Sequence, residues 1–244
     1  MNTDNMSIHG LTIDYGPYGW LEDYNPGWTP NTTDSSTRRY RYGQQPQIAA
    51  WNLARLLEAM IPLMDDPEQL HDVLSAYTTC FDQHHNQMWV EKLGLNEFCN
   101  EDEELVRTLN SLLQEVETDM TIFFRLLCTL QSPNIESFTS AFYDESTIPV
   151  PAWNEWLEAW WSRVEGQPNR EAMLQANPKY VLRNWMAQLA IDAAEKGDFS
   201  VCESLHELLQ DPYGEQPEHE EEWFQKRPEW ARNRVGCSML SCSS

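Results

Sequence analysis

Residues 3–17 read TDNMSIHGLTIDYGP. Within this stretch, two short apolar runs at 6–8 and 11–13 are separated by His9-Gly10. Short apolar runs joined by a pair that contains glycine are typical of a β-hairpin. The sequence therefore predicts a short β-hairpin close to the first residue.

The polar residues that flank this hairpin form a candidate metal site. Pairing of the two runs would bring Asp4, Asn5 and Asp14 to the same end of the hairpin. Two carboxylates and an amide oxygen are hard ligands suited to Mg²⁺, which takes one or two carboxylates together with phosphate oxygens. Asp14-Tyr15-Gly16 also has the form of the Asp-aromatic-Gly turn that holds metal in kinase-type sites. Because Asp and Asn also favour turns and caps that bind no metal, the spacing alone leaves both interpretations open.

The remainder of the chain reads as mainly α. Apolar residues recur at helical spacing, and Pro46 stands in the expected first turn of the first helix. We expect helices over residues 48–60, 67–93, 101–116, 120–130, 153–164, 180–194 and 198–209. Residues 120–130 are apolar nearly all round, which predicts a buried helix. Asp198 is a candidate N-cap for the last of these helices.

The charge of the chain limits its partners. The formal net charge is −23, and contacts with phosphates need clustered Lys and Arg. We therefore expect binding neither to nucleic acid nor to a membrane. No apolar run reaches the 18 residues of a membrane-spanning helix, and residues 1–10 lack the features of a signal peptide, so a soluble protein is expected. The acidic run at 215–222 predicts a solvated face or loop.

The cysteines and histidines suggest no disulfide scaffold or metal centre. The six cysteines include no C-x-x-C pair, which favours a reducing compartment such as the cytoplasm. Cys80, Cys128 and Cys202 fall in apolar helical patterns, where free cysteine behaves as a small hydrophobe. Four histidines without partners at metal-ligand spacing are expected at the surface or in a satisfied core: His71, His84, His85 and His206.

Four stretches of the chain resemble the selenoprotein O family. They read MNTDNMSIHGLTIDYGPYGWLEDYNPGW at 1–28, YGQQPQIAAWNLARL at 42–56, NPKYVLRNWMAQLAI at 177–191 and SCSS at 241–244. Members of that family have a protein-kinase-like fold, bind ATP and transfer AMP to Ser, Thr or Tyr hydroxyls of proteins. The resemblance implies that the chain is the C-terminal lobe of such a fold, with the short β-hairpin at its N-terminus.

The resemblance also implies roles for individual residues. Asp4 corresponds to the catalytic base. Asn5 and Asp14 correspond to ligands of Mg²⁺, with Mn²⁺ as an alternative metal, and Asp14 would meet the ATP phosphates through that metal. Cys242 stands where some members carry selenocysteine and is a redox candidate. In other members a cysteine at that place pairs with one in the activation segment, but here Pro30 occupies the partner position.

On the same basis the chain divides into three parts. Residues 1–45 would form the metal-binding hairpin and an activation-type segment, residues 46–210 the helical body and residues 211–244 an irregular tail, all in a single domain. Three arginines in the first part alternate with tyrosines: Arg38, Arg39 and Arg41. They would either contact a phosphate or a substrate acid, or balance an acidic body.

The parts that bind a triphosphate are not found in the sequence. No glycine-rich phosphate loop occurs, and no Lys precedes Lys92. We therefore expect a fragment that lacks the N-terminal lobe and is inactive alone. A kinase-fold phosphotransferase and a non-catalytic helical interaction module remain as alternatives. The protein substrates are not indicated, and a eukaryotic parent would make a mitochondrial location an alternative to the cytoplasm.

Overall fold

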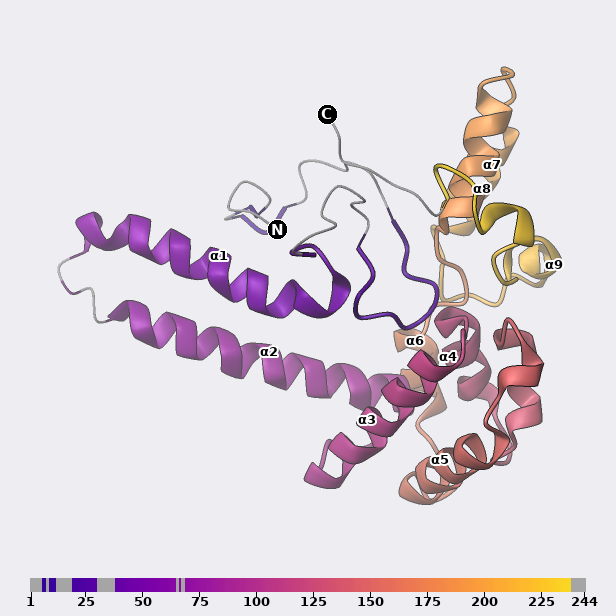
Figure 1. The fold of residues 1–244 in the computed structure, drawn as a ribbon, viewed down its shortest axis with the longest axis horizontal. Coiled ribbons are helices and arrows are strands. Elements are labelled where there is room, and N and C mark those ends of the chain that lie inside the picture. The colour runs from indigo at the N-terminus through magenta and orange to yellow at the C-terminus, as the bar shows by residue number, and fades with distance from the viewer. Residues whose placement is uncertain are drawn as a thin grey trace. The chain divides into compact units, whose positions relative to one another are not determined.

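The computed structural model describes residues 6–7, 9–11, 19–29, 38–64, 66 and 69–237. These residues are mainly helical, as predicted, and the part described contains no strand beyond an isolated bridge (Figure 1). Their contacts divide them into two compact units. One unit takes its described residues from Met1–Gly19 and Asn25–Asn86, and the other from Trp20–Tyr24 and Gln87–Ser238.

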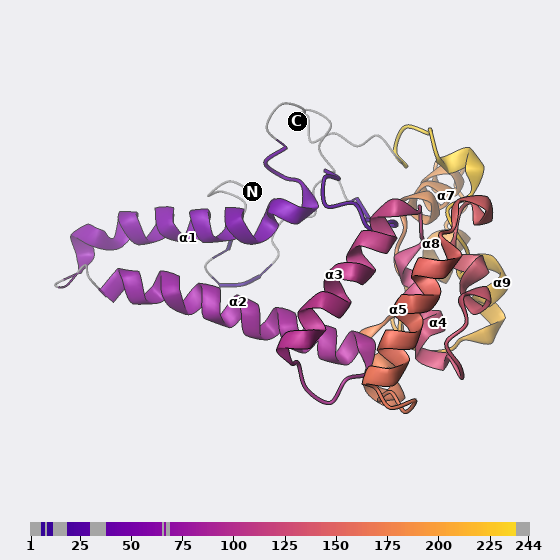
Figure 2. The same cartoon turned by 60° about the horizontal axis from the view of Figure 1, so that its bottom comes forward.

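The first unit is built on two helices. These are α1 (Gln45–Met60) and the first part of α2 (Gln69–Leu93), which lie side by side in both views (Figure 1, Figure 2). Pro46 stands in the first turn of α1, as expected. The Tyr77 hydroxyl donates to the Pro46 carbonyl at 2.9 Å, which ties the two helices together. Two short 3₁₀ helices flank α1: η2 (Tyr42–Gln44) and η3 (Ile61–Leu63).

The second unit holds the larger core. Besides the end of α2, its helices are α3 (Asn100–Glu115), α4 (Met120–Thr129), α5 (Val150–Arg163), α6 (Arg170–Ala176), α7 (Asn184–Ala194), α8 (Ser200–Leu208) and α9 (Glu220–Trp223). Its 3₁₀ helices are η4 (Ile135–Ala141), η5 (Glu145–Thr147), η6 (Pro217–His219) and η7 (Glu229–Ala231). The part of this unit around α3, α4 and α5 has one apolar core, and the part around α7 and α8 has another.

Tryptophans of α5 form the centre of the first core. Trp153, Trp156 and Trp160 recur on one helix face and are at most 2% exposed. Phe123 of α4 packs on Trp153 with 5.3 Å between ring centroids. Most of α4 is buried, so the prediction from its all-round apolar sequence is confirmed. Aromatic side chains bury large areas, so this face contributes strongly to the stability of the unit.

The helix predicted from residue 180 begins four residues later. α7 starts at Asn184 because the preceding residues are committed to other contacts. The backbone N–H groups of Lys179 and Tyr180 both donate to the Pro212 carbonyl, at 2.8 and 3.1 Å. Asp198 is not the N-cap of α8, because that position is Phe199, but its carboxylate accepts the Ser200 N–H at 3.0 Å from one residue before the cap.

Two expectations about individual side chains are wrong in part. Cys128 is buried, as predicted, but Cys80 and Cys202 are exposed because they lie on outward faces of α2 and α8. The acidic run at 215–222 is exposed for the most part, but two of its glutamates bind a buried lysine. Glu215 and Glu220 accept hydrogen bonds from the buried Lys179 ammonium, at 3.1 and 2.7 Å.

The expectation for the histidines is confirmed. The four histidines named above, His71, His84, His85 and His206, are exposed. The described residues contain no group of three or more His, Cys, Asp or Glu side chains placed to hold a metal ion. No helix in the described ranges combines the length and apolar character needed to cross a membrane.

Candidate functional site

The residues predicted to carry the chemistry lie outside the described residues. These are Asp4, Asn5, Asp14 and Cys242, together with Pro30 at the position expected for a redox partner. Their assignments therefore stay predictions. What the structure does describe is a turn within the predicted hairpin and the segment that follows Asp14 in the chain.

A tight turn occurs where the sequence predicted one. The Gly10 N–H donates to the Ser7 carbonyl at 3.2 Å, and the His9 N–H donates to the Ser7 hydroxyl at the same distance. Gly10 has a φ of +68°, in the left-handed region that glycine adopts without a steric cost. Pairing of the two flanking runs lies outside the described residues and stays a prediction.

The segment after Asp14 is anchored in the second unit through its backbone. The Met120 N–H, in the first turn of α4, donates to the Glu22 carbonyl at 2.9 Å. The Trp20 N–H donates to the Asn184 side-chain oxygen, at the start of α7, at 3.1 Å. Residues 20–24 are thus held between the first turns of two helices.

The Glu22 side chain extends this anchor into a buried ionic network. Glu22 is 6% exposed, and its Oε2 accepts a hydrogen bond from Arg227 Nη1 at 2.9 Å. Its Oε1 lies 3.8 Å from Arg183 Nη1, which is too long for a hydrogen bond. This Oε1 has no hydrogen-bond partner among the described residues.

Asp119 links the same arginine to α4. It is fully buried, and its Oδ1 accepts both the Ile122 N–H at 3.0 Å and Arg183 Nη2 at 2.9 Å. Arg183 Nη1 also donates to Asp119 Oδ2. A bidentate ion pair between a guanidinium group and a carboxylate is stronger and more directional than a single hydrogen bond. Asp119 therefore caps α4 and fixes the cation that faces Glu22.

The network continues to the surface through Glu117. Arg227 Nη2 donates to Glu117 Oε1 at 2.7 Å, and Arg232 donates to Glu117 Oε2 at 3.1 Å. The Tyr143 hydroxyl accepts a hydrogen bond from the backbone N–H of Arg227 at 3.1 Å. Three carboxylates, of Glu22, Glu117 and Asp119, thus face three guanidinium groups. This balance offsets the cost of removing the charges from water.

Burial sets the protonation of the innermost groups. Loss of solvent raises the pKa of Glu22, and the charges of Arg183 and Arg227 oppose that rise. Loss of solvent also raises the pKa of Tyr143, and the nearby Asp119 and Glu22 carboxylates raise it further. The Tyr143 hydroxyl is therefore neutral at physiological pH and acts as a hydrogen-bond acceptor rather than as a base.

Of the three arginines at 38, 39 and 41, Arg39 contacts α1 and Arg41 contacts the residues that precede it. The guanidinium of Arg39 lies 4.2 Å from the ring centroid of Trp51, within reach of a cation–π interaction. Arg41 donates to the Arg38 carbonyl at 3.3 Å and to the Gln44 side chain. Whether these arginines also meet a phosphate or a substrate acid stays a prediction.

Comparison with known proteins identifies the family. Residues 1–210 match the family model described as protein adenylyltransferase SelO. The chain belongs to the SelO family. The resemblance read from its sequence is therefore confirmed, and the match takes in the predicted metal-binding stretch and the Glu22 anchor.

Relatives of this SelO-family chain are named protein nucleotidyltransferase YdiU. The protein from Flavobacterium johnsoniae is 50% identical over 257 residues, which cover all of this chain and 49% of that protein. The proteins from Aromatoleum aromaticum and Rhodopirellula baltica are 49% and 50% identical over 253 and 268 residues, which cover all of this chain and 48% and 49% of theirs. The chain spans about half the length of the curated relatives it matches.

Sequence reasoning missed the anchor in this SelO-family chain. Asp119 directly precedes the apolar run that became α4, so its role as an N-cap was readable from the sequence. Arg183 stood as a lone cation in an apolar pattern, which hinted at a buried ion pair. Nothing local pointed from either residue to Glu22, because their contact joins segments far apart in the chain.

Proposed function

We propose that the chain carries the catalytic and metal-binding part of a kinase-like protein adenylyltransferase. The enzyme would transfer AMP from ATP to Ser, Thr or Tyr hydroxyls of proteins. The observation that carries this proposal is the match of residues 1–210 to the adenylyltransferase family. Identity of 50% over the whole chain to a named nucleotidyltransferase supports it. The mainly helical architecture and the turn at Gly10 are consistent with a kinase-like C-terminal lobe that opens with a hairpin.

The proposed roles follow from the chemistry of the side chains. Asp4 would accept the proton of the attacking hydroxyl. That oxygen forms a bond to the α-phosphorus of ATP, and pyrophosphate leaves. Asn5 and Asp14 fit Mg²⁺ as ligands because amide and carboxylate oxygens are hard donors, and Mn²⁺ accepts similar ligands. When bound, the metal would neutralise charge on the phosphates.

The Glu22 anchor has a positioning role in this proposal. Asp14 lies shortly before the segment that is held between α4 and α7. A fixed end restricts where the preceding residues can go. Even small errors in the placement of a metal ligand such as Asp14 impair catalysis. Glu22 would therefore act through Asp14 and not on the substrate itself.

We further propose that these 244 residues transfer no AMP by themselves. They contain no glycine-rich phosphate loop and no lysine before Lys92, so they lack the donors that hold a triphosphate. The groups that bind the triphosphate would come from a further polypeptide segment. We expect the enzyme to act in the cytoplasm.

A chimera tests the proposal. The chain is fused to the part of the Flavobacterium johnsoniae protein outside the matched half, and both the chimera and the chain alone are incubated with ATP labelled in the α-phosphate. We expect labelled protein with the chimera, none with the chain alone and none with Asp14→Ala in the chimera. Mass spectrometry of the product separates AMP from phosphate, and a phosphate adduct would favour the phosphotransferase alternative. Transfer by the chain alone would contradict the proposed dependence on a further segment.

A further inference from the structure

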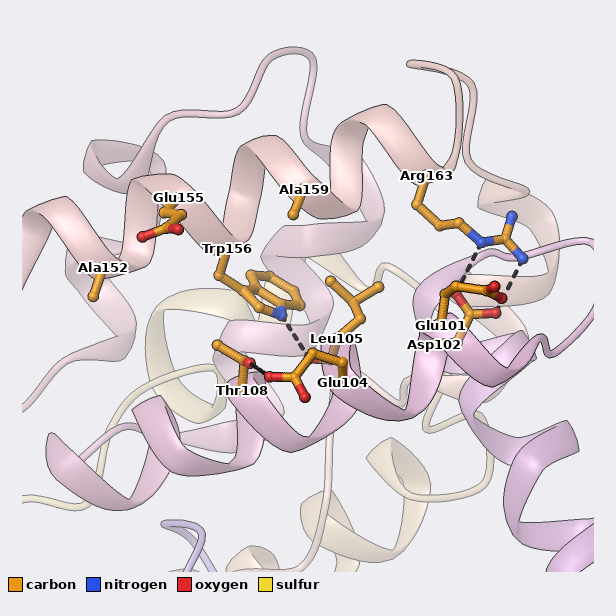
Figure 3. A pocket seen from close by; sticks show the side chains of 10 residues that line it. All are labelled: Glu101, Asp102, Glu104, Leu105, Thr108, Ala152, Glu155, Trp156, Ala159 and Arg163. Atoms are coloured by element: carbon orange, nitrogen blue, oxygen red, sulfur yellow. Dashed lines mark hydrogen bonds and ion pairs between the residues drawn. The ribbon is translucent and has the colours of Figure 1, made fainter.

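A groove of about 470 Å³ lies between α3 and α5 of the second unit (Figure 3), and none of its lining residues belongs to the Glu22 network. Its apolar lining comes mainly from four side chains: Leu105, Ala152, Trp156 and Ala159. Its volume is that of a typical ligand site, and a lining that combines apolar surface with a few polar groups is common in such sites.

Two alanines of α5 line the groove, and their small side chains leave its space unfilled. Ala152 and Ala159 lie about two turns apart on α5, so both face α3. Between them, the Trp156 indole N–H donates to the Leu105 carbonyl at 2.9 Å. This bond and the burial of Trp156 fix the floor, so the groove is preformed.

The rim of the groove is negative. Glu101 on α3 and Glu155 on α5 are exposed and have no ion pair among the residues that the structure describes. Arg163, the cation in the lining, is already neutralised, since its Nε lies 2.8 Å from Asp102 Oδ1. Glu104, a further lining residue, pairs with Arg107 in an exposed contact of small energetic weight.

We propose that this groove docks a basic, apolar segment of a protein substrate. Apolar side chains of the segment would cover Leu105 and Ala159, and Lys or Arg side chains beside them would face Glu101 and Glu155. An open groove between two helices suits an amphipathic segment better than a compact molecule. The negative rim selects cationic segments and repels nucleic acid. The identity of the partner as a substrate rests on the proposed function, whereas the chemistry of docking does not.

Peptide binding to the purified chain tests the proposal. The probe is a fluorescein-labelled amphipathic peptide with Leu at i, i+3, i+4 and i+7 and Lys between them, and the control peptide has Glu in place of each Lys. We expect the Lys peptide to bind with an affinity that falls as salt rises, and the Glu peptide not to bind. Fluorescence anisotropy measures both.

Matched variants separate the groove from the general acidity of the chain. Glu101→Gln with Glu155→Gln should weaken binding by about fivefold or more, because both charge contacts with the peptide are lost. Glu203→Gln with Glu207→Gln removes the same charge from the exposed face of α8 and should change the affinity less than twofold. Ala159→Trp should fill the groove and abolish binding. Equal weakening by both double variants, or full binding by Ala159→Trp, would overturn the proposal.

A protection experiment gives the location directly. In the variant Ala159→Cys, binding of the Lys peptide should slow the alkylation of the introduced thiol by maleimide at least fivefold. Mass spectrometry of proteolytic fragments of the chain measures the extent of alkylation at each cysteine. The exposed native Cys202 serves as the internal control and should react at an unchanged rate. Circular dichroism melting curves verify that the variants are folded. Equal protection of both thiols would overturn the assignment to this groove. AMP transfer plays no part in these measurements, so their failure and a failure of the proposed function are distinguishable.

Discussion

Glu22 and Arg227 lie 205 positions apart in the chain, yet Oε2 of the first accepts a hydrogen bond from Nη1 of the second at 2.9 Å. This contact joins the segment that follows the predicted metal ligands to a residue beyond the predicted helical body of residues 46–210. Arg227 is held in turn by Glu117, at 2.7 Å. The placement of the early segment therefore depends on residues from a distant part of the chain.

Removal of the Glu22 carboxylate should loosen this segment. Glu22→Ala leaves Arg183 and Arg227 partly uncompensated in a buried site, and we expect the free energy of unfolding to fall by about 2–4 kcal/mol. The Trp20 amide, which donates to Asn184, should exchange with solvent faster. Urea unfolding and hydrogen exchange read by mass spectrometry measure the two effects. The matched control is Glu203→Ala on the exposed face of α8, with a change within about 0.5 kcal/mol. An unchanged exchange rate in Glu22→Ala would show that the backbone contacts alone hold the segment.

Two tryptophans of α5 should differ in their tolerance of phenylalanine. Trp160 and Trp153 are both fully buried, but the Trp160 indole N–H donates to the Leu93 carbonyl at 2.9 Å. The Trp153 N–H has no hydrogen-bond partner among the described residues. Trp160→Phe leaves a buried carbonyl unsatisfied, so it should cost about 1–2 kcal/mol more than Trp153→Phe. Thermal or urea unfolding of the two variants compares them directly. Equal losses would mean that lost volume, rather than the hydrogen bond, determines the cost.

Much of the helical architecture could be predicted because it depends on local pattern. The run at 120–130 is apolar all round, and it became the buried helix α4. Asp198 was predicted as the N-cap of α8, but the cap is Phe199, one residue later, and Asp198 accepts the Ser200 N–H from the preceding position. The start of α7 was misplaced because Lys179 and Tyr180 are held by Pro212, a contact that no local pattern reveals.

The anchor was beyond sequence reasoning for the same reason. Glu22 was one acid in a loop, and its burial follows only from arginines contributed by distant segments. Likewise, Glu215 read as part of a solvated acidic run, although it accepts a hydrogen bond from the buried Lys179 at 3.1 Å. A metal site at Asp4, Asn5 and Asp14 was one of two interpretations that the spacing left open. The family resemblance gave each residue its role, and their placement stays a prediction.

Lys92 should make stability depend on pH in the alkaline range. Its Nζ lies 2.8 Å from Asn177 Oδ1 and 4.0 Å from the centroid of the Phe124 ring. Burial lowers the pKa of Lys92 from 10.5 to about 8, and the nearby Cys128 side chain partly opposes this shift. Between these two values the unfolded chain holds a proton that the folded chain has released. The free energy of unfolding therefore rises with pH in this window, and below about pH 8 the cost of burying the ammonium is present in full.

The comparison with Lys92→Met isolates this effect. The variant cannot titrate at this position, so the difference in unfolding free energy, native minus variant, should grow by roughly 1–3 kcal/mol from pH 7.5 to pH 10. Titration of Cys128 and of the tyrosines occurs in both proteins and largely cancels in the difference. Urea unfolding at several pH values measures it. A difference that stays flat across this range would mean that Lys92 keeps its proton in the folded chain.

The different roles proposed for Asp4 and Asp14 predict different defects when each residue is replaced in the chimera. Asp4→Ala removes the proton acceptor but no metal ligand, so ATP binding should persist while AMP transfer falls by about 100-fold or more. Asp14→Ala removes a metal ligand, so binding of ATP should lose its dependence on Mg²⁺ and transfer should fall as well. Calorimetric titration with a non-hydrolysable ATP analogue, with and without Mg²⁺, separates the two outcomes, and Asp198→Ala at the start of α8 is the control for loss of a carboxylate. If Asp4→Ala abolished Mg²⁺-dependent binding and Asp14→Ala preserved it, the two roles would have to be exchanged. Since Glu22 is proposed to act through Asp14, Glu22→Gln should reduce the affinity for Mg²⁺ in the same titration without changing ATP binding in the absence of the metal.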